Sequence, residues 1–488
     1  MTWRRQVVIV AAITALGGAL RLYQIGAQSL WLDELFSVVV ARRDWLQVIV
    51  GTAQGDTNPP LFNLLLHLAL QFGSDETAAR AVSFMFSTAT IPLFYVLARD
   101  LFDVGVACVA TLILAINPLH LFYAQEARMY AQLAFCMLGA MFFFRRAWRE
   151  GRVDDWTLFA FATALAFYTH SLAFLNLLAL DAFALMQRQY RRAPWCALVL
   201  AHAVIGILFA PWILVLLQQT TRVQAGFWGA MPSPVALLMT PYLFLFSTVA
   251  PVLLIPVALF AALALLVFAI VAACQTIVSR RADASSVSFA IVILIVPLVV
   301  LYLLSFVRPI FVERTLLPAS FGLYLLLAWA LVRVEPRMLN CALGVVVGLV
   351  IVVALPNYYF NPATHKPPMR EAARALVAQF QPGDSIAHTS DSSALAFMYY
   401  APHLPNQFLA GDPDYVTTTT RGQTGRVAGL VPQDMDAIVT GHARVWLVVA
   451  LDHNVEYQKA RVHQFDERFE RRGILEVGKI TLLLYEIC

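Results

Sequence analysis

Residues 249–278 read VAPVLLIPVALFAALALLVFAIVAACQTIV and carry no charged side chain. A helix needs about 20 mainly apolar residues to cross the hydrocarbon core of a bilayer, so this stretch is long enough to span it. Comparable apolar stretches recur from Val7 to Pro356 and then stop. The pattern predicts a mainly α-helical protein that crosses a membrane many times.

Eleven membrane spans are predicted from these stretches. The composition agrees, because 60% of the residues are hydrophobic and only 13% are charged, against about 25% charged in soluble domains. The one alternative is that 156–187 forms a single tilted helix, which would reverse the side of every later segment. The predicted spans are 7–25, 79–98, 104–123, 130–145, 156–170, 172–187, 196–217, 249–278, 287–306, 316–332 and 338–355.

The distribution of arginines predicts the orientation of the spans. Cytoplasmic loops carry the excess of Lys and Arg, so Arg4 and Arg5 place the N-terminus in the cytoplasm. An odd number of spans then puts loop 26–78 and the segment after Pro356 on the outer face of the cytoplasmic membrane. The loops assigned to the cytoplasmic side contain Arg99, Arg145, Arg146, Arg149, Arg152, Arg188, Arg191, Arg192, Arg280, Arg281, Arg333 and Arg337.

The C-terminal part mixes charge, Gly, Pro and short apolar runs, as a folded aqueous domain does. Helices are expected at 370–380 and 457–471, and strands after Pro382-Gly383-Asp384 and at 445–450. The sequence therefore predicts two domains. A transmembrane domain that carries the chemistry covers 1–355 with outer loop 26–78, and a small exoplasmic α/β domain covers 356–488.

Charge and cysteine usage exclude several classes of protein. The formal net charge is only +4, and no basic cluster is interleaved with aromatic residues, so nucleic acid is not an expected partner. The six cysteines show no CxxC spacing, which argues against a zinc site or a disulfide framework. The first apolar run is long and lacks a clear cleavage site, so it is expected to be a membrane helix rather than a signal peptide.

The first outer loop opens with an acidic pair in the stretch SLWLDELFS, residues 29–37. Carboxylates at a bilayer surface are costly and need compensation. Neighbouring residues on a helix point about 100° apart, so Asp33 and Glu34 cannot both face one pocket of a regular helix. We expect one to be catalytic and the other structural; the alternative is a solvated pair at a helix start.

The second outer loop carries NPLHLFYAQEARMY at residues 117–130. The mouth of this span carries the carboxylate of Glu126, the guanidinium of Arg128 and the phenol hydroxyl of Tyr130. Pro118 loosens the helix there, so the three side chains are not confined to the spacing of a regular helix. The alternative is that Arg128 reaches to lipid headgroups and Glu126 pairs with it.

The third outer cluster is RPIFVER, residues 308–314, between two apolar spans. Guanidinium groups bind phosphate oxygens in a bidentate manner, so Arg308 and Arg314 suit a lipid phosphate. An internal bridge from Glu313 to Arg314, or anchoring at headgroups, is equally compatible with the pattern.

Three further polar residues are weaker candidates. Asp56 begins DTNPP, a turn-like stretch that can shape a pocket or merely punctuate a loop. His170 ends the run Tyr168-Thr169-His170 at an outer turn, where it can bind phosphate or acceptor, or serve as a hydrogen-bonded structural residue. His67 lies in an apolar helix and is expected in the core.

Six motifs taken in order resemble the GT-C glycosyltransferases that use lipid-phosphate sugars, a group that includes protein O-mannosyltransferases and aminoarabinose transferases. The resemblance implies a catalytic acid at Asp33, a second acid at Glu126 with Arg128 beside it, and a donor-binding Arg314. The contiguous pair Asp33 and Glu34 replaces the acidic-x-acidic motif of metal-dependent members, so no metal or other cofactor is expected. The motifs are RLYQIGAQSLWLDELFS, DTNPPLFNLLLHL, RAVSFMFSTATIPLFYVLARDLF, NPLHLFYAQEARMY, YTHSLAFL and RPIFVERTLLPAS.

The implied activity is transfer of a hexosyl or pentosyl sugar from a polyprenyl-phosphate donor to a lipid, glycan or protein acceptor at the outer face of the membrane. Asp33 is expected to accept the proton of the attacking hydroxyl, and inversion at the anomeric carbon is expected. Arg128 and Arg314 would stabilise the departing phosphate, and Glu126 would orient the base or the sugar.

Other classes of function remain open. A transporter or flippase of lipid-linked sugars also needs many spans, although its charges are expected near the midplane in related halves. A membrane anchor for a binding domain at 356–488 would need only one span. A polymerase or ligase of surface polysaccharide is a further possibility within the enzyme class.

Overall fold

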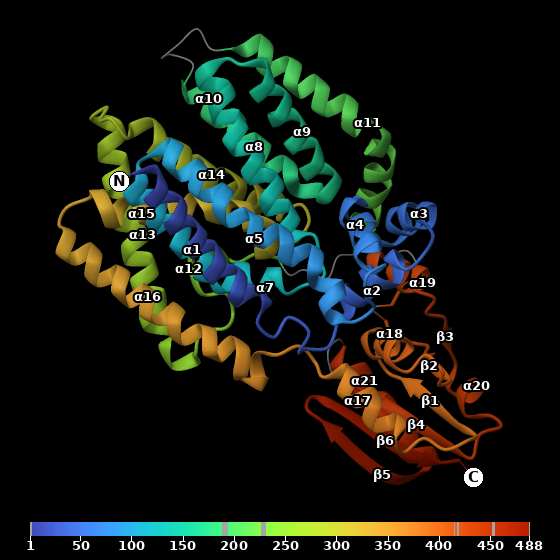
Figure 1. Cartoon of the computed structure of the whole chain (residues 1–488). Coiled ribbons are helices and arrows are strands. Elements are labelled where there is room, and N and C mark those ends of the chain that lie inside the picture. Colours follow the sequence, from blue (N-terminus) through green and yellow to red (C-terminus); the bar gives the residue numbers. More distant parts are fainter. Residues whose placement is uncertain are drawn as a thin grey trace. The chain divides into compact units, whose positions relative to one another are not determined.

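The computed structural model describes residues 2–187, 194–225, 231–413, 415–416, 419–450 and 454–487. Arg188, Arg191 and Arg192, which the sequence assigns to a cytoplasmic loop, lie outside these ranges. The chain divides into two compact units, whose helices and strands are labelled in Figure 1. The helical unit is Met1–Gln24, Arg80–Leu216 and Phe227–Thr364, and the sheet unit is Ile25–Ala79, Leu217–Gly226 and His365–Cys488.

The helical unit consists of helices and short 3₁₀ turns, and the ranges of α5 and α11 extend a few residues beyond it. In chain order they are α1 (Trp3–Leu22), α5 (Glu76–Leu101), α6 (Val104–Ile116), α7 (Pro118–Ala124), α8 (Tyr130–Glu150), α9 (Val153–Thr169), η1 (Ser171–Ala173), α10 (Phe174–Gln187), α11 (Trp195–Ala225), α12 (Pro234–Phe246), η2 (Val252–Leu254), α13 (Ile255–Val278), α14 (Ala284–Leu304), η3 (Glu313–Ala319), α15 (Ser320–Arg333), α16 (Arg337–Phe360) and η4 (Pro362–Thr364).

Each of the eleven predicted spans coincides with a helix or with a pair of consecutive helical segments. Among the described residues, seven helices are long and apolar enough to cross a membrane, and α6 with α7 makes an eighth if the bent pair is one span. Three predicted spans are not among these helices, because they are too short or not apolar enough to be counted: α8, α9, and η1 with α10. Helix α12 was not predicted. The chain is a multi-pass membrane protein with the predicted helical architecture.

Helix α15 forms the centre of the helical unit. It packs against α6, α13, α14 and α16. All of its residues from Ser320 to Ala330 are buried. Gly322 lets α14 approach closely, because a Cβ there would lie 2.4 Å from the carbonyl oxygen of Ala290. Small residues at such contacts are how membrane helices come together without a hydrophobic driving force.

The boundary between α6 and α7 is a bend of 53° at Asn117. Pro118 supplies no backbone N–H and therefore begins a new helix, and the Asn117 side chain accepts a hydrogen bond from the His120 backbone N–H. The last carbonyl groups of α6 are satisfied by Arg21, which donates to Leu114 at 3.1 Å and to Ala115 at 2.7 Å. The single helix expected at 104–123 is thus broken, and the chain turns before α8.

In its described residues, the sheet unit contains six strands and eight helices besides α5 and α11. They are α2 (Leu32–Ala41), α3 (Trp45–Gly55), α4 (Leu61–Ala69), α17 (Met369–Val377), β1 (Asp384–His388), α18 (Asp391–Tyr400), β2 (Asn406–Leu409), α19 (Thr420–Val427), β3 (Pro432–Gln433), α20 (Met435–Val439), β4 (Arg444–Val449), α21 (Val455–Arg468), β5 (Glu470–Val477) and β6 (Ile480–Glu486).

The sheet has the strand order β3-β2-β1-β4-β6-β5. Strands β1 to β4 pair in parallel, whereas β6 is antiparallel to both β4 and β5. The α/β class and the strands at 384–388 and 444–449 agree with the prediction. The helix expected to reach Arg471 is wrong at its end, because the chain leaves α21 after Arg468 and pairs with β6 from Glu470.

Residues 25–79 group with the C-terminal sheet, whereas the sequence assigned loop 26–78 to the membrane domain. Helix α2 packs against α18, and α3 packs against α19. A Cβ at Gly55 would lie 2.9 Å from the Phe36 ring and 3.0 Å from the Val427 side chain, which shows how closely these segments approach. Apolar faces of residues 25–79 are therefore buried against partners more than 300 residues away in the chain, which local patterning does not reveal.

Candidate functional site

The helical unit gathers seven side chains that bear on chemistry, and we call them the helical-unit cluster. Helix α7 ends at Ala124 and α8 begins at Tyr130, so Glu126 and Arg128 lie in an irregular turn rather than on a helix. The turn is held by Gln125, whose amide donates to the Arg21 carbonyl at 2.9 Å. The cluster consists of Tyr123, Glu126, Arg128, Tyr130, His170, Glu313 and Arg314.

Aromatic rings join the members of this cluster. The Arg314 guanidinium lies 5.3 Å from the centroid of the Tyr130 ring, a cation–π contact. The Tyr130 ring is 5.1 Å from that of Tyr123 and 5.9 Å from that of His170. Tyr130 therefore connects η3 to the α9–η1 turn and holds the planar guanidinium in a defined position.

Charged groups of both signs act on these rings. Arg128 and Arg314 both interact electrostatically with His170, and Glu126, Glu313 and Arg314 interact with Tyr123. Glu126 is 1% exposed and Arg128 is 7% exposed, so these charges are largely removed from water and their fields are strong. The structure brings together five residues that the sequence predicted as site residues, namely Glu126, Arg128, Tyr130, His170 and Arg314.

His170 follows the last residue of α9 and begins η1. Its Nδ1 accepts a hydrogen bond from the Leu172 backbone N–H at 3.0 Å. The neutral ring consequently carries its proton on Nε2, which is left to donate. The imidazole is 5% exposed, so it is both fixed in tautomer and shielded from bulk water.

Tyr123 and Glu313 belong to the cluster but were not predicted as site residues. Tyr123 lies in the quoted NPLHLFYAQEARMY motif, where the alternation of aromatic and charged residues was a usable signal. Arg308 behaves differently: it is half-buried between α14 and η3, and no ring contact or ion pair joins it to the cluster in the described part of the chain.

In the sheet unit, the acidic pair occupies the first turn of α2. Glu34 is fully buried and its carboxylate accepts from Lys366 Nζ at 2.8 Å and from the Trp31 backbone N–H at 3.3 Å. Asp33 is half-buried on the same turn, and its backbone carbonyl accepts from Ser37 Oγ at 3.2 Å. The two neighbours thus differ in surroundings, as helical geometry requires.

The segment before α2 is fastened to the C-terminal part of the sheet unit. Ser29 Oγ donates to Glu371 at 2.8 Å, and the Leu30 backbone N–H donates to the Tyr400 hydroxyl at 2.8 Å. Burial, followed by the negative charge of Glu76, keeps the pKa of Tyr400 well above its usual value, although the Leu30 N–H acts in the opposite direction. The Tyr400 hydroxyl therefore remains a neutral donor, to Glu76 at 2.8 Å.

Asp56 ends α3 and organises the turn that follows it. Its Oδ1 accepts from the backbone N–H groups of Thr57 at 2.7 Å and Asn58 at 3.1 Å. The Gln219 amide donates to the Asp56 carbonyl at 3.1 Å. These contacts are those of a turn-forming aspartate. His67, expected in the core, is half-buried and lies 2.8 Å from the Ala41 carbonyl.

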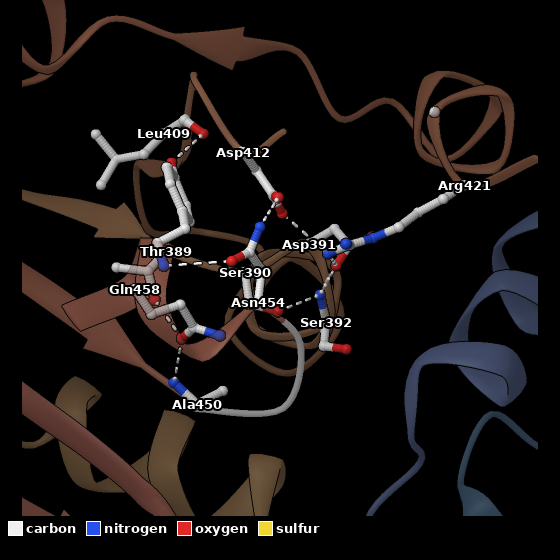
Figure 2. Close-up of polar contacts among 12 residues, drawn as sticks. Thr389, Ser390, Asp391, Ser392, Leu409, Asp412, Arg421, Ala450, Asn454 and Gln458 are labelled. Atoms are coloured by element: carbon white, nitrogen blue, oxygen red, sulfur yellow. Dashed lines mark hydrogen bonds and ion pairs between the residues drawn. The ribbon is translucent and has the colours of Figure 1, made fainter. Parts of the chain in front are cut away.

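A second polar cluster, absent from the sequence prediction, lies where β1, β2 and β4 end, and Figure 2 shows it. Arg421 donates to both oxygens of Asp391, at 2.6 and 2.7 Å, and reaches Asp412 at 3.2 Å. Thr389 donates to Gln458 at 2.8 Å, and Asn454 to Asp412 at 3.3 Å. We call these six residues the sheet cluster; their charges meet opposite charges at short range.

Within the described ranges, no three side chains of His, Cys, Asp or Glu are grouped so that they could hold a metal ion.

Comparison with known proteins finds a family model that matches part of the chain and several solved structures with a similar fold. The family model for dolichyl-phosphate-mannose-protein mannosyltransferase matches residues 57–215, a range that includes Glu126, Arg128, Tyr130 and His170. A comparison with curated protein sequences finds no match. ArnT from Cupriavidus metallidurans in the apo state is similar in structure, with a TM-score of 0.67, 14% identity, and coverage of 98% of this chain and 97% of ArnT.

The undecaprenyl phosphate-bound structure of the same ArnT gives a TM-score of 0.64 at 13% identity, over 99% of this chain and 98% of ArnT. This is the GT-C fold. The archaeal oligosaccharyltransferase AglB from Archaeoglobus fulgidus, in complex with an inhibitory peptide and a dolichol-phosphate, matches with a TM-score of 0.56 at 10% identity, over 99% of this chain and 74% of AglB. The resemblance to GT-C proteins seen in the sequence motifs is confirmed, and the shared fold covers both the helical unit and the sheet unit.

Proposed function

We propose that this chain is an integral-membrane glycosyltransferase that moves a hexosyl or pentosyl sugar from a polyprenyl-phosphate donor to a lipid, glycan or protein acceptor. The observation that carries the proposal is the helical-unit cluster, where two arginines, an imidazole and two carboxylates meet around tyrosine rings. The matched mannosyltransferase family and the fold shared with ArnT support the same reaction class.

In the proposed reaction, the acceptor hydroxyl attacks the anomeric carbon as the bond to the phosphate oxygen breaks. Asp33 takes the hydroxyl proton, and the leaving group departs as polyprenyl phosphate. Help from a general base typically contributes roughly 10²- to 10⁴-fold to the rate. Direct displacement inverts the configuration of the anomeric carbon.

The arginines of the cluster have the task of holding the phosphate. Arg314 presents a planar guanidinium fixed by Tyr130, and Arg128 adds a second buried positive charge. His170 donates from Nε2 to a phosphate oxygen, because its Nδ1 is already occupied by Leu172. Preorganised donors of this kind stabilise charge that grows in the transition state.

The remaining candidates have supporting tasks. Glu126 orients the sugar or the base, and Arg308 contacts donor headgroup oxygens. Glu34 holds Lys366 and the start of α2, which positions Asp33 one residue earlier. Asp56 keeps the turn after α3 in shape. We place this chemistry on the outer face of the cytoplasmic membrane, with the N-terminus inside.

The test begins with cells that carry or lack the gene. Mass spectrometry of their glycolipids and glycoproteins identifies the sugar that the chain adds, and complementation with variants then assigns the residues. Asp33→Asn should fail to restore the product, with a loss of at least about 10²-fold in turnover, while the purified variant still binds undecaprenyl phosphate.

Glu34→Gln is the matched control on the same helix turn. It should lower the amount of folded protein, because Lys366 loses its carboxylate partner, but the folded fraction should remain active. Near-normal turnover of Asp33→Asn would remove Asp33 from the mechanism. Transport of a lipid-linked sugar without any glycosylated product would favour the flippase alternative instead.

A further inference from the structure

The opposite end of the helical unit contains a groove between α1, α5 and α8, with a volume of about 1020 Å³. Its walls are mainly apolar and include Val7, Ala11, Val96 and Phe142. Trp3, Val7 and Val96 are 67%, 47% and 43% exposed, so the groove opens on the lipid-facing surface. This volume is at the upper end of the range of small-molecule sites, which is about 300–1,000 Å³.

The groove is remote from the helical-unit cluster. Helix α1 contains 20 residues and is therefore about 30 Å long. Trp3 and Gln6 line the groove near the start of α1, whereas Gln125, which holds the turn of the cluster, contacts the carbonyl groups of Arg21 and Tyr23 at the other end. The groove and the helical-unit cluster therefore lie toward opposite ends of α1.

Charged residues gather at the open end of the groove. Three arginines line it against two carboxylates, Asp100 and Glu150. The three arginines are Arg99, Arg146 and Arg149. Arg149 forms ion pairs with Asp100 at 2.6 Å and with Glu150 at 2.8 Å. Arg146 lies 3.3 Å from Asp155.

Arg99 lies over the Trp3 ring at 5.7 Å. It is exposed, and no carboxylate lies within ion-pair distance of it among the described residues. The rim therefore retains a positive charge that the protein does not neutralise.

Polar and aromatic groups also mark the level of the headgroups. Trp3 stands at the rim, where tryptophan is favoured because its ring is amphipathic. Tyr95 donates to Gln6 at 3.3 Å, which links α5 to α1 across the base of the rim. Below this level the lining consists of aliphatic and aromatic side chains that suit hydrocarbon.

We propose that this groove binds one anionic phospholipid of the leaflet in which the N-terminus lies, with an acyl chain between α1, α5 and α8 and the phosphate at Arg99. Charge complementarity indicates this occupant. An acyl chain fits the apolar wall, and the negative charge of the headgroup pairs with the guanidinium of Arg99. A basic residue near an anionic headgroup contributes about 1 kcal/mol. The inference does not depend on the transferase chemistry.

Native mass spectrometry of the purified full-length protein tests it, with phosphatidylglycerol and phosphatidylcholine of identical acyl chains as probes. We expect one tightly held phosphatidylglycerol and weaker retention of phosphatidylcholine. Arg99→Gln should weaken phosphatidylglycerol binding about fivefold, whereas Arg281→Gln, an exposed arginine outside the groove, should not. Ala11→Trp should fill the apolar wall and lower retention of both lipids.

Equal retention of the two phospholipids, or equal effects of Arg99→Gln and Arg281→Gln, would overturn the proposal. Displacement of bound lipid by undecaprenyl phosphate with no preference for phosphatidylglycerol would also overturn it and assign the groove to the carrier lipid. The readout is lipid retention rather than sugar transfer, so a failure here leaves the proposed function untouched.

Discussion

The helical-unit cluster and the sheet cluster both combine largely buried polar side chains with arginine, yet the groups around the arginine differ. In the sheet cluster, Arg421 meets Asp391 and Asp412 at 2.6 to 3.2 Å. In the helical-unit cluster, Arg314 lies over a tyrosine ring and acts, together with Arg128, on a histidine. In the sheet cluster a guanidinium pairs with two carboxylates, an arrangement that stabilises a fold, whereas in the helical-unit cluster guanidinium groups and an imidazole gather around tyrosine rings, and we propose that they bind a ligand anion.

The largest expected effect is on the sheet cluster. Arg421→Ala leaves two carboxylates that are each 3% exposed without their cation, and breaking a buried pair costs about 3–5 kcal/mol. Hydrogen exchange of residues 384–400 should show protection reduced by that amount. Arg426→Ala, exposed on the same helix, is the control. Loss of transfer with unchanged protection would break the comparison, because it would make Arg421 a ligand-binding residue.

The next effect is on the rate of sugar transfer. Arg314→Ala should lower the rate by about 10²- to 10³-fold, the loss typical for one preorganised charge-stabilising donor. Arg314→Lys should recover part of it, because lysine keeps the charge but not the planar fork. Arg337→Ala, which is exposed, should have no effect. A collapse of exchange protection across η3 and α15 in Arg314→Ala would instead mean that Arg314 supports the fold.

A pH-dependent effect distinguishes the buried His388 of the sheet. Burial lowers its pKa to about 4, and the hydrogen bond with Asn406 opposes this only in part. The unfolded chain, with a histidine pKa of about 6.5, binds the proton first. The stability of the sheet is therefore complete above about pH 6.5 and falls by roughly 3 kcal/mol as the pH drops to about 4.

Hydrogen exchange of the sheet as a function of pH checks this expectation. His388→Gln should flatten the dependence between pH 4 and 6.5, while His403→Gln, at an exposed position, should leave it in place. A dependence that survives His388→Gln would locate the titrating group elsewhere in the sheet unit.

The smallest effect concerns the ring beneath Arg314. Tyr130→Leu removes the cation–π contact, which is worth about 1 kcal/mol, and should weaken undecaprenyl phosphate binding roughly fivefold. Tyr130→Phe keeps the ring and should bind nearly as well as the unmodified protein. Equal losses in the two variants would show that the hydroxyl, not the ring face, carries the role of Tyr130.

Much of the architecture follows from local sequence. Apolar length alone locates eleven helical segments, because a bilayer requires each to bury its own backbone polar groups. The motif at 117–130 predicted that Glu126, Arg128 and Tyr130 lie together at the mouth of a span, the family resemblance added Arg314 to the same site, and Pro118 indicated the loosened helix. The bend of 53° depends on Arg21, 96 positions earlier than Asn117 in the sequence, which satisfies the freed carbonyl groups.

The partners of individual charges were beyond the reach of the sequence. Nothing near Glu34 in the chain indicates Lys366, and Asp391 gives no sign of Arg421, because ion pairs between distant segments depend on how those segments pack. The same holds for loop 25–79, whose helices bury their apolar faces against α18 and α19. Sequence by itself determined the membrane helices, the α/β character of the C-terminal part and the candidate residues, since these depend on local hydrophobicity and spacing. Only the tertiary structure decided which distant charges pair and which side chains gather in the helical-unit cluster, since electrostatic pairing acts through space.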